Sequence, residues 1–93
     1  MSDELTINQI RIEETCDKIK NLLIEKNRSY GDSALSPVRV FSKASAEEQL
    51  LVRLDDKISR IARGKEFPGD DTLMDLAGYL VLLLVSRGNS PAT

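Results

Sequence analysis

The 93-residue sequence contains no histidine and no tryptophan, and its one cysteine is Cys16. The absence of histidine excludes His-ligated zinc, a Ser-His-Asp triad and a histidine general base. A single cysteine excludes an intrachain disulfide, and its place among apolar residues at helical spacing indicates a small buried hydrophobe rather than a reactive thiol. With two Tyr and two Phe as the whole aromatic content, the chain has little with which to stack nucleic-acid bases.

A long apolar run and a strong charge of one sign are missing as well. The apolar segment at residues 73–85 is too short to cross a membrane and contains Asp75. The N-terminal Met-Ser-Asp-Glu has neither the basic start nor the apolar stretch of a signal peptide. The net charge is −2, and the 13 Lys and Arg residues are scattered, which argues against direct nucleic-acid binding. We therefore expect a cytoplasmic protein that does not contact membranes.

The patterns that are present predict a single all-α domain over residues 1–93, with frayed ends at 1–5 and 87–93. Apolar residues repeat at helical spacing in two segments, and three main helices are expected. The first helix covers about residues 6–27, the second runs from the N-cap Ser45 to Gly64, and the third follows the N-cap Asp70. The expected buried stripes are Ile12, Cys16, Ile19 and Leu23 in the first helix and Leu51, Leu54, Ile58 and Ile61 in the second.

A long connection, residues 28–44, separates the first two helices. Turn-forming residues fill 28–33, and Pro37 resists helix formation. We expect Val38, Val40 and Phe41 to pack onto the domain. The sequence leaves open whether this loop closes over a ligand or simply connects two helices.

The third helix is apolar nearly all round from Leu76 to Val85, and such a helix is normally covered on every side. So short a chain has too few other residues to cover it. We therefore expect a homo-oligomer, a dimer or a tetramer, whose helices complete a shared bundle.

Asp75 is the single charged residue in this apolar helix, and a carboxylate in such surroundings must be paired, hydrogen-bonded, protonated or bound to a metal. Asp71 lies one turn before Asp75, and Asp55 borders the stripe of the preceding helix. Oxygen ligands favour Mg²⁺ or Mn²⁺. The sequence thus predicts a magnesium site made by Asp55, Asp71 and Asp75, whereas Asp56 falls on the arginine-rich side of its helix.

Gly78 lies about one turn after Asp75 on the same face. A glycine inside a helix costs roughly 1 kcal/mol relative to alanine. We expect another helix or a ligand to approach closely there.

Several of these residues together resemble the nucleotide modification associated domain 1 family, whose members are small, often phage-encoded proteins grouped near genes of nucleotide metabolism. The resemblance extends from about Lys18 to Leu84. The motifs that carry it are Lys26-Asn27 followed by Tyr30-Gly31-Asp32-Ser33, then Val38-Arg39, the segment 49–61 with Arg53, Asp55-Asp56-Lys57 and Arg60, and finally Asp75-Leu76-Ala77-Gly78-Tyr79.

The chain is more distantly similar to the MazG-type all-α nucleoside triphosphate pyrophosphohydrolases. These proteins oligomerise through helices and hold Mg²⁺ with a Glu-x-x-Glu pair on one helix and a Glu-x-x-Asp pair on the next. Asp75 matches the final Asp, but Thr72 occupies the position of the preceding Glu, and Ser59 or Arg60 stands where a Glu of the first pair should be. The resemblance implies a MazG-like bundle with an incomplete acidic set.

These observations support three hypotheses. The first is a nucleotide-binding protein that acts as a Mg²⁺-dependent pyrophosphohydrolase; the second is a protein that sequesters a nucleotide or cyclic nucleotide without catalysis. The third is a helical interaction module in which Asp75 pairs with Arg53 or Arg60 across an interface. For the first two, Tyr30 would stack on a base, Gly31 would allow close approach, and Arg39, Arg53 or Lys57 would neutralise phosphate. The resemblance adds Asp32, Asp56, Arg60 and Tyr79 to the expected ligand-binding residues.

Overall fold

The computed structural model describes residues 4–37, 39–64 and 71–88, and every regular element in these ranges is an α-helix. The three helices are α1 (Ile7–Tyr30), α2 (Ala46–Arg63) and α3 (Thr72–Ser86). The all-α class and the three main helices are therefore confirmed. Among the described residues, no helix combines the length and the apolar character needed to cross a membrane.

The helix α1 begins where the sequence predicts but ends later. Thr6 and Gln9 form a capping box at its start. The Thr6 hydroxyl accepts a hydrogen bond from the Gln9 backbone amide, and the Gln9 side-chain oxygen accepts one from the Thr6 backbone amide. The helix continues through Tyr30, three residues beyond the predicted end, and stops at Gly31, whose φ of 70° is readily adopted by glycine. The prediction that residues 28–30 form a turn is wrong, because this glycine ends the helix and the polar residues before it do not.

The ends of α2 agree with the sequence. The Ser45 hydroxyl accepts a hydrogen bond from the Glu48 amide, and Gly64 adopts a left-handed conformation with φ 66° and ψ 24°. The predicted stripe is only partly right, since the buried residues of α2 are Leu50 and Leu54. Ile58 and Ile61 are 53% and 44% exposed; Ile61 shares the helix face of Leu50 and Leu54 but lies close to the end of α2.

The N-cap of α3 differs from the prediction by one residue. The Asp71 carboxylate accepts a hydrogen bond of 3.0 Å from the Met74 amide and is the N-cap. The predicted cap, Asp70, lies outside the described residues. This shift places Asp75 in the first turn of α3, where a negative charge is favoured by the helix dipole.

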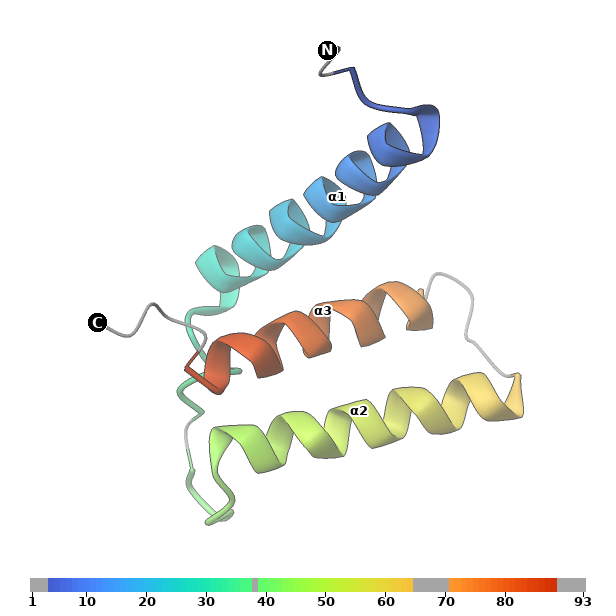
Figure 1. Cartoon of the computed structure of the whole chain (residues 1–93). Coiled ribbons are helices and arrows are strands. Elements are labelled where there is room, and N and C mark those ends of the chain that lie inside the picture. The colour runs from blue at the N-terminus through green and yellow to red at the C-terminus, as the bar shows by residue number, and fades with distance from the viewer. Residues whose placement is uncertain (1–3, 38, 65–70, 89–93) are drawn as a thin grey trace.

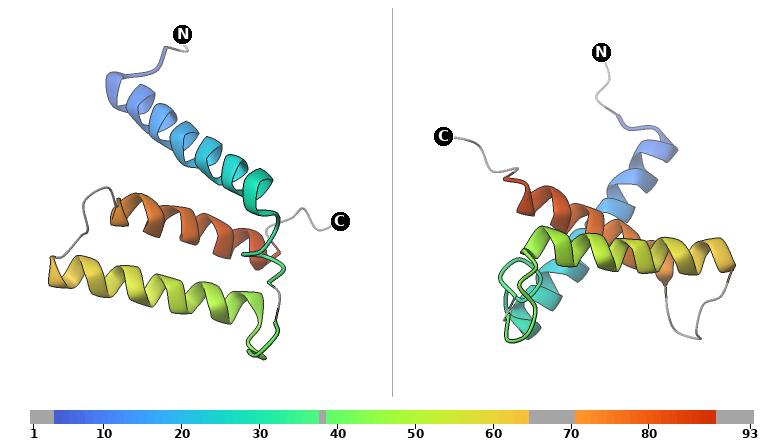
Figure 2. Two further views of the ribbon diagram at one scale, coloured as in Figure 1. Left: turned by 180° about the vertical axis from the view of Figure 1, so that it is seen from behind. Right: turned by 90° about the horizontal axis from the view of Figure 1, so that it is seen from below.

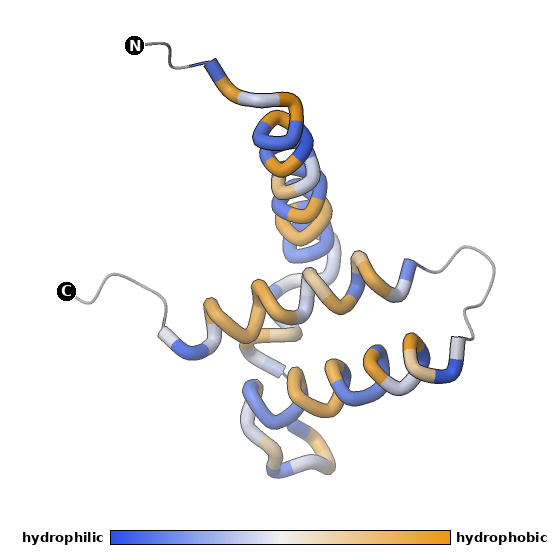
Figure 3. Tube along the Cα trace, turned by 45° about the vertical axis from the view of Figure 1, so that its right-hand side comes forward, coloured by the Kyte–Doolittle hydropathy of each residue, from blue (hydrophilic) through white to orange (hydrophobic). Residues whose placement is uncertain are grey.

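The helix α3 is the central element. It packs antiparallel along α2, and on another side it is crossed by α1, while α1 and α2 do not contact each other (Figures 1 and 2). An ion pair of 2.6 Å between Arg87 Nε and Glu47 Oε1 connects the end of α3 to the start of α2. The arrangement explains why the central helix is apolar on more than one side, as its orange colour in Figure 3 shows.

The chain as a whole is open. Its Cα radius of gyration is 16.0 Å, whereas a compact domain of this length has about 12 Å. The N-terminal half of α1 stands away from the other helices in both Figure 1 and Figure 2, and α1 has no buried residue. Cys16, predicted to be buried, is exposed, and so are Val40 and Phe41, which were predicted to pack down; Val38 lies outside the described residues.

Candidate functional site

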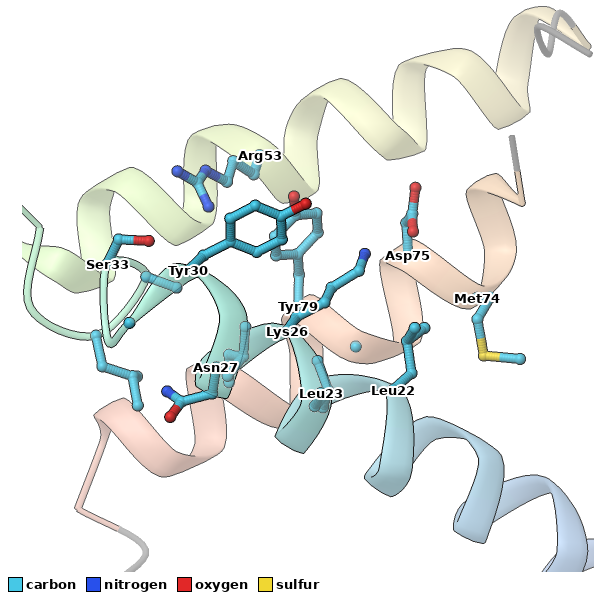
Figure 4. Close-up of a pocket in the computed structure, with 15 residues that line it drawn as sticks. Leu22, Leu23, Lys26, Asn27, Tyr30, Ser33, Arg53, Met74, Asp75 and Tyr79 are labelled. Atoms are coloured by element: carbon cyan, nitrogen blue, oxygen red, sulfur yellow. The ribbon is translucent and has the colours of Figure 1, made fainter. Parts of the chain in front are cut away.

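A cavity of about 330 Å³ lies between the C-terminal end of α1 and the middle of α3. The turn after α1 closes one end, and Arg53 reaches the cavity from α2 (Figure 4). It is therefore built by segments from all three helices. The lining residues are Leu22, Leu23, Lys26, Asn27, Tyr30, Gly31, Ser33, Ala34, Leu35, Arg53, Met74, Asp75, Gly78, Tyr79 and Leu82.

Hydrogen bonds fix the turn that forms the end of the cavity. The side-chain amide of Asn27 donates a hydrogen bond to the Asp32 carboxylate at 2.9 Å. The backbone carbonyl of Asp32 accepts one from the backbone amide of Ser36 at 2.7 Å. These bonds tie residues 32–36 to the last turn of α1, so that Ser33 and Leu35 form part of the wall. Asp32, which the sequence predicts to bind a ligand, forms these bonds and does not line the cavity; its role in ligand binding stays a prediction.

Two tyrosines and two cations line the same cavity. The Arg53 guanidinium lies 5.7 Å from the centre of the Tyr79 ring, within the range of a cation–π interaction. Tyr30 is 75% exposed, and its ring lies on the Arg53 side of the cavity in Figure 4. Neither Lys26 nor Arg53 forms an ion pair with any residue that the structure describes. The cavity thus offers aromatic surface together with positive charge that no described acidic residue neutralises.

Asp75 lies at the edge of this cavity and has a basic partner. Its Oδ2 atom is 3.2 Å from the Nζ atom of Lys57 on α2, and both side chains are largely withdrawn from solvent. One hypothesis pairs Asp75 with Arg53 or Arg60 across an interface. In the structure, Asp75 pairs with Lys57 of the same chain. The ion pair accounts for a carboxylate in an otherwise apolar helix.

Gly78 marks the point where α1 crosses α3. A Cβ atom at this position would lie 3.2 Å from the Leu23 Cδ2 atom, closer than an ordinary van der Waals contact. The expected close approach of another helix at Gly78 is confirmed. This crossing brings Leu23 and Lys26 of α1 to the cavity.

The three predicted magnesium ligands are engaged differently from one another. Asp71 caps α3, Asp75 pairs with Lys57, and Asp55 is exposed on α2 away from the cavity. In the ranges that the structure covers, no three His, Cys, Asp or Glu side chains lie close enough to hold a metal ion. The magnesium site stays a prediction.

The structure divides the predicted ligand-binding residues. Tyr30, Gly31, Arg53 and Tyr79 line the same cavity. The others do not line it: Asp32 holds the turn, Arg39 is exposed in the loop, Lys57 pairs with Asp75, and Asp56 pairs with Arg60 at 3.2 Å. The pairing of Asp56 with an arginine agrees with its place on the arginine-rich side of α2.

Of the α1 residues that line the cavity, Leu23, Lys26 and Asn27 are not among the predicted ligand-binding residues, whereas Tyr30 is. Leu23, Lys26, Asn27 and Tyr30 are spaced at i, i+3, i+4 and i+7, which places all four on one face of a helix. That signal was available in the sequence. The predicted helix ends at Asn27, so the prediction does not place Tyr30 on the same helix face as Leu23, Lys26 and Asn27.

Comparisons with protein-family models, with curated proteins and with solved structures find no match for this chain.

Proposed function

We propose that the chain binds a nucleotide, or a closely related phosphate-bearing aromatic molecule, in the cavity between α1 and α3. The observation that carries this proposal is the placement of Lys26 and Arg53, without acidic partners among the described residues, beside Tyr30 and Tyr79. Aromatic rings suit a base, and cations suit a phosphate. The volume of about 330 Å³ is at the lower end of the range of small-molecule sites.

The lining residues suggest how such a ligand is held. The exposed ring of Tyr30 offers a face for a base, and base–aromatic stacking contributes about 1–3 kcal/mol. Arg53 can hold two phosphate oxygens with its planar guanidinium while Lys26 adds a second charge. The apolar wall formed by Leu22, Leu23 and Leu82 excludes water from the other side of the ligand.

Membership of the nucleotide modification associated domain 1 family, and a distant relationship to MazG-type pyrophosphohydrolases, are part of this proposal. The residues that carry the resemblance include Tyr30, Gly31, Arg53, Asp75 and Tyr79, and all five line the cavity. The proposal extends to a cytoplasmic protein of phage or bacterial nucleotide metabolism that works as a MazG-like homo-oligomer.

Within this proposal, sequestration is favoured over hydrolysis. Asp75 is engaged by Lys57 at 3.2 Å, so a Mg²⁺ ion would have to displace the ammonium group before Asp75 could bind it. If the ion pair opens, Asp75 would be the residue that holds a Mg²⁺ ion, which would supply neutralisation of phosphate charge, and the released Lys57 would add positive charge to the site. Hydrolysis is thus the second candidate, and it requires the ion pair to open.

Incubation with a panel of nucleotides, with and without Mg²⁺, separates the hypotheses. Thermal stabilisation with intact ligand recovered after denaturation supports sequestration, whereas product formation that is lost in Asp75→Asn supports the enzyme. Lys26→Met should abolish the stabilisation, and Lys18→Met, an exposed lysine of the same helix outside the cavity, should retain it. If no nucleotide gives a thermal shift or a product, the sequestration and hydrolysis hypotheses both fail and the helical interaction module remains.

A further inference from the structure

The free surface of α1 and a second, apolar groove have complementary features. The groove has a volume of about 460 Å³ and lies between α1 and α3. Its apolar lining residues are Cys16, Ile19, Leu23, Ile24, Val81, Leu82 and Val85. Its polar lining residues are Asn27 and the basic Lys20 and Arg28. Val81, Val85 and Ile24 are 39%, 49% and 44% exposed, so apolar surface is open to solvent along the groove.

The N-terminal half of α1 has apolar residues that no other described part of the chain covers. Ile12 and Cys16 continue the stripe that, one and two turns later, contributes Ile19 and Leu23 to the groove. Ile12 is 62% exposed, and this half of the helix extends away from α2 and α3 (Figure 2). A helix with a narrow apolar stripe and nothing to pack against is typical of a helix that pairs with another.

The two halves of α1 also differ in charge. Residues 7–18 carry three acidic and two basic side chains, a net charge of −1, whereas residues 19–30 carry one acidic and three basic, a net charge of +2. The basic half borders the groove through Arg28 and through Lys20, which also pairs with Asp17 of its own helix at 3.2 Å. The acidic half carries Glu13, Glu14 and Asp17. An antiparallel pair of α1 helices would place opposite charges together, whereas a parallel pair would place like charges together.

We propose that the groove receives the N-terminal half of α1 from a second copy of this chain, with the two α1 helices antiparallel. The contact is reciprocal, because each copy offers both a free acidic, apolar half-helix and a groove with basic edges. Such a self-complementary surface generates a closed two-fold dimer. The groove shares Leu23, Asn27 and Leu82 with the proposed ligand cavity, so these residues separate two neighbouring hollows.

Light scattering at micromolar concentration tests the association, with matched variants. The wild type should have twice the chain mass of 10.4 kDa. Ile12→Glu should reduce it to a monomer, whereas Val52→Glu, a residue of similar exposure on α2 outside the groove, should leave the dimer intact. A monomeric wild type, or a dimer that survives Ile12→Glu, overturns the proposal. Circular dichroism of Ile12→Glu, expected to remain helical, separates loss of association from loss of folding.

Disulfide cross-linking tests the orientation. In a Cys16→Ser background, an oxidised mixture of Ile12→Cys and Ile24→Cys chains should give a cross-linked heterodimer, because antiparallel pairing about the middle of α1 brings these positions together. Ile12→Cys alone should not cross-link, since its two copies would lie at opposite ends of the interface. Efficient cross-linking of Ile12→Cys alone, without the heterodimer, overturns the antiparallel arrangement. This test does not depend on the identity of any ligand.

Discussion

Lys57 on α2 and Asp75 on α3 form an ion pair of 3.2 Å in which the lysine side chain is only 14% exposed. The pair lies in the interface that contains Leu50 and Leu54, so it joins the two helices beside their buried contact. The pair satisfies the carboxylate of an otherwise apolar helix, and Lys57 does not line the cavity between α1 and α3.

Asp75→Asn should destabilise the chain by about 1–3 kcal/mol, because it leaves a largely buried ammonium without its charged partner. Urea unfolding at a fixed protein concentration measures the loss. Asp56→Asn is the matched control, since it breaks the more exposed ion pair with Arg60 and should cost less than about 1 kcal/mol. Equal losses in the two variants would show that the Lys57–Asp75 pair has no special place in the fold.

Asp71→Ala should cost about 1 kcal/mol through the loss of the N-cap of α3, whereas Asp71→Ser should retain most of the stability. The loss should be the same with and without a metal chelator, because the Asp71 carboxylate is used by the Met74 amide. If the loss appears only when Mg²⁺ is present, Asp71 acts as a metal ligand and the capping role is secondary.

Gly78→Leu should destabilise the chain by about 1–3 kcal/mol, because a large side chain would meet Leu23 and push α1 away from α3. Gly78→Ala should stay within about 1 kcal/mol of the wild type, since the gain in helix propensity offsets the tight 3.2 Å contact. Thermal unfolding of both variants checks the difference. A Gly78→Leu chain as stable as the wild type would mean that the crossing at Leu23 contributes little.

Local sequence signals predicted the helices well. Ser45 and Gly64 delimit α2, and the helical class follows from the apolar spacing, because caps and periodicity depend on neighbouring residues. The crossing of α1 over α3 at Gly78 was also predictable, because a glycine in a helix interior lowers helix stability and indicates a close approach of another element. These features require no knowledge of how the helices are arranged.

The partners of side chains were harder to predict. Which side of α2 meets α3 depends on the hairpin geometry. The contact keeps Leu54 of the predicted stripe but turns toward Leu50, and Lys57, not Arg53 or Arg60, reaches Asp75. Only part of the lining of the cavity between α1 and α3 is predictable from the sequence. Tyr30, Arg53 and Tyr79 were identified from motifs, but Lys26 was missed because the end of α1 was placed too early.

Tyrosine-ring NMR offers the most direct test of the proposed site. The chain has two tyrosines, Tyr30 and Tyr79, and both line the cavity, so ¹³C-labelled tyrosine reports on this site and on no other part of the protein. Titration with a nucleotide panel should shift both ring signals in a saturable way, and the shifts should be lost in Lys26→Met but kept in Lys18→Met. If neither ring signal moves for any nucleotide at millimolar concentration, with or without Mg²⁺, the cavity is not a nucleotide site.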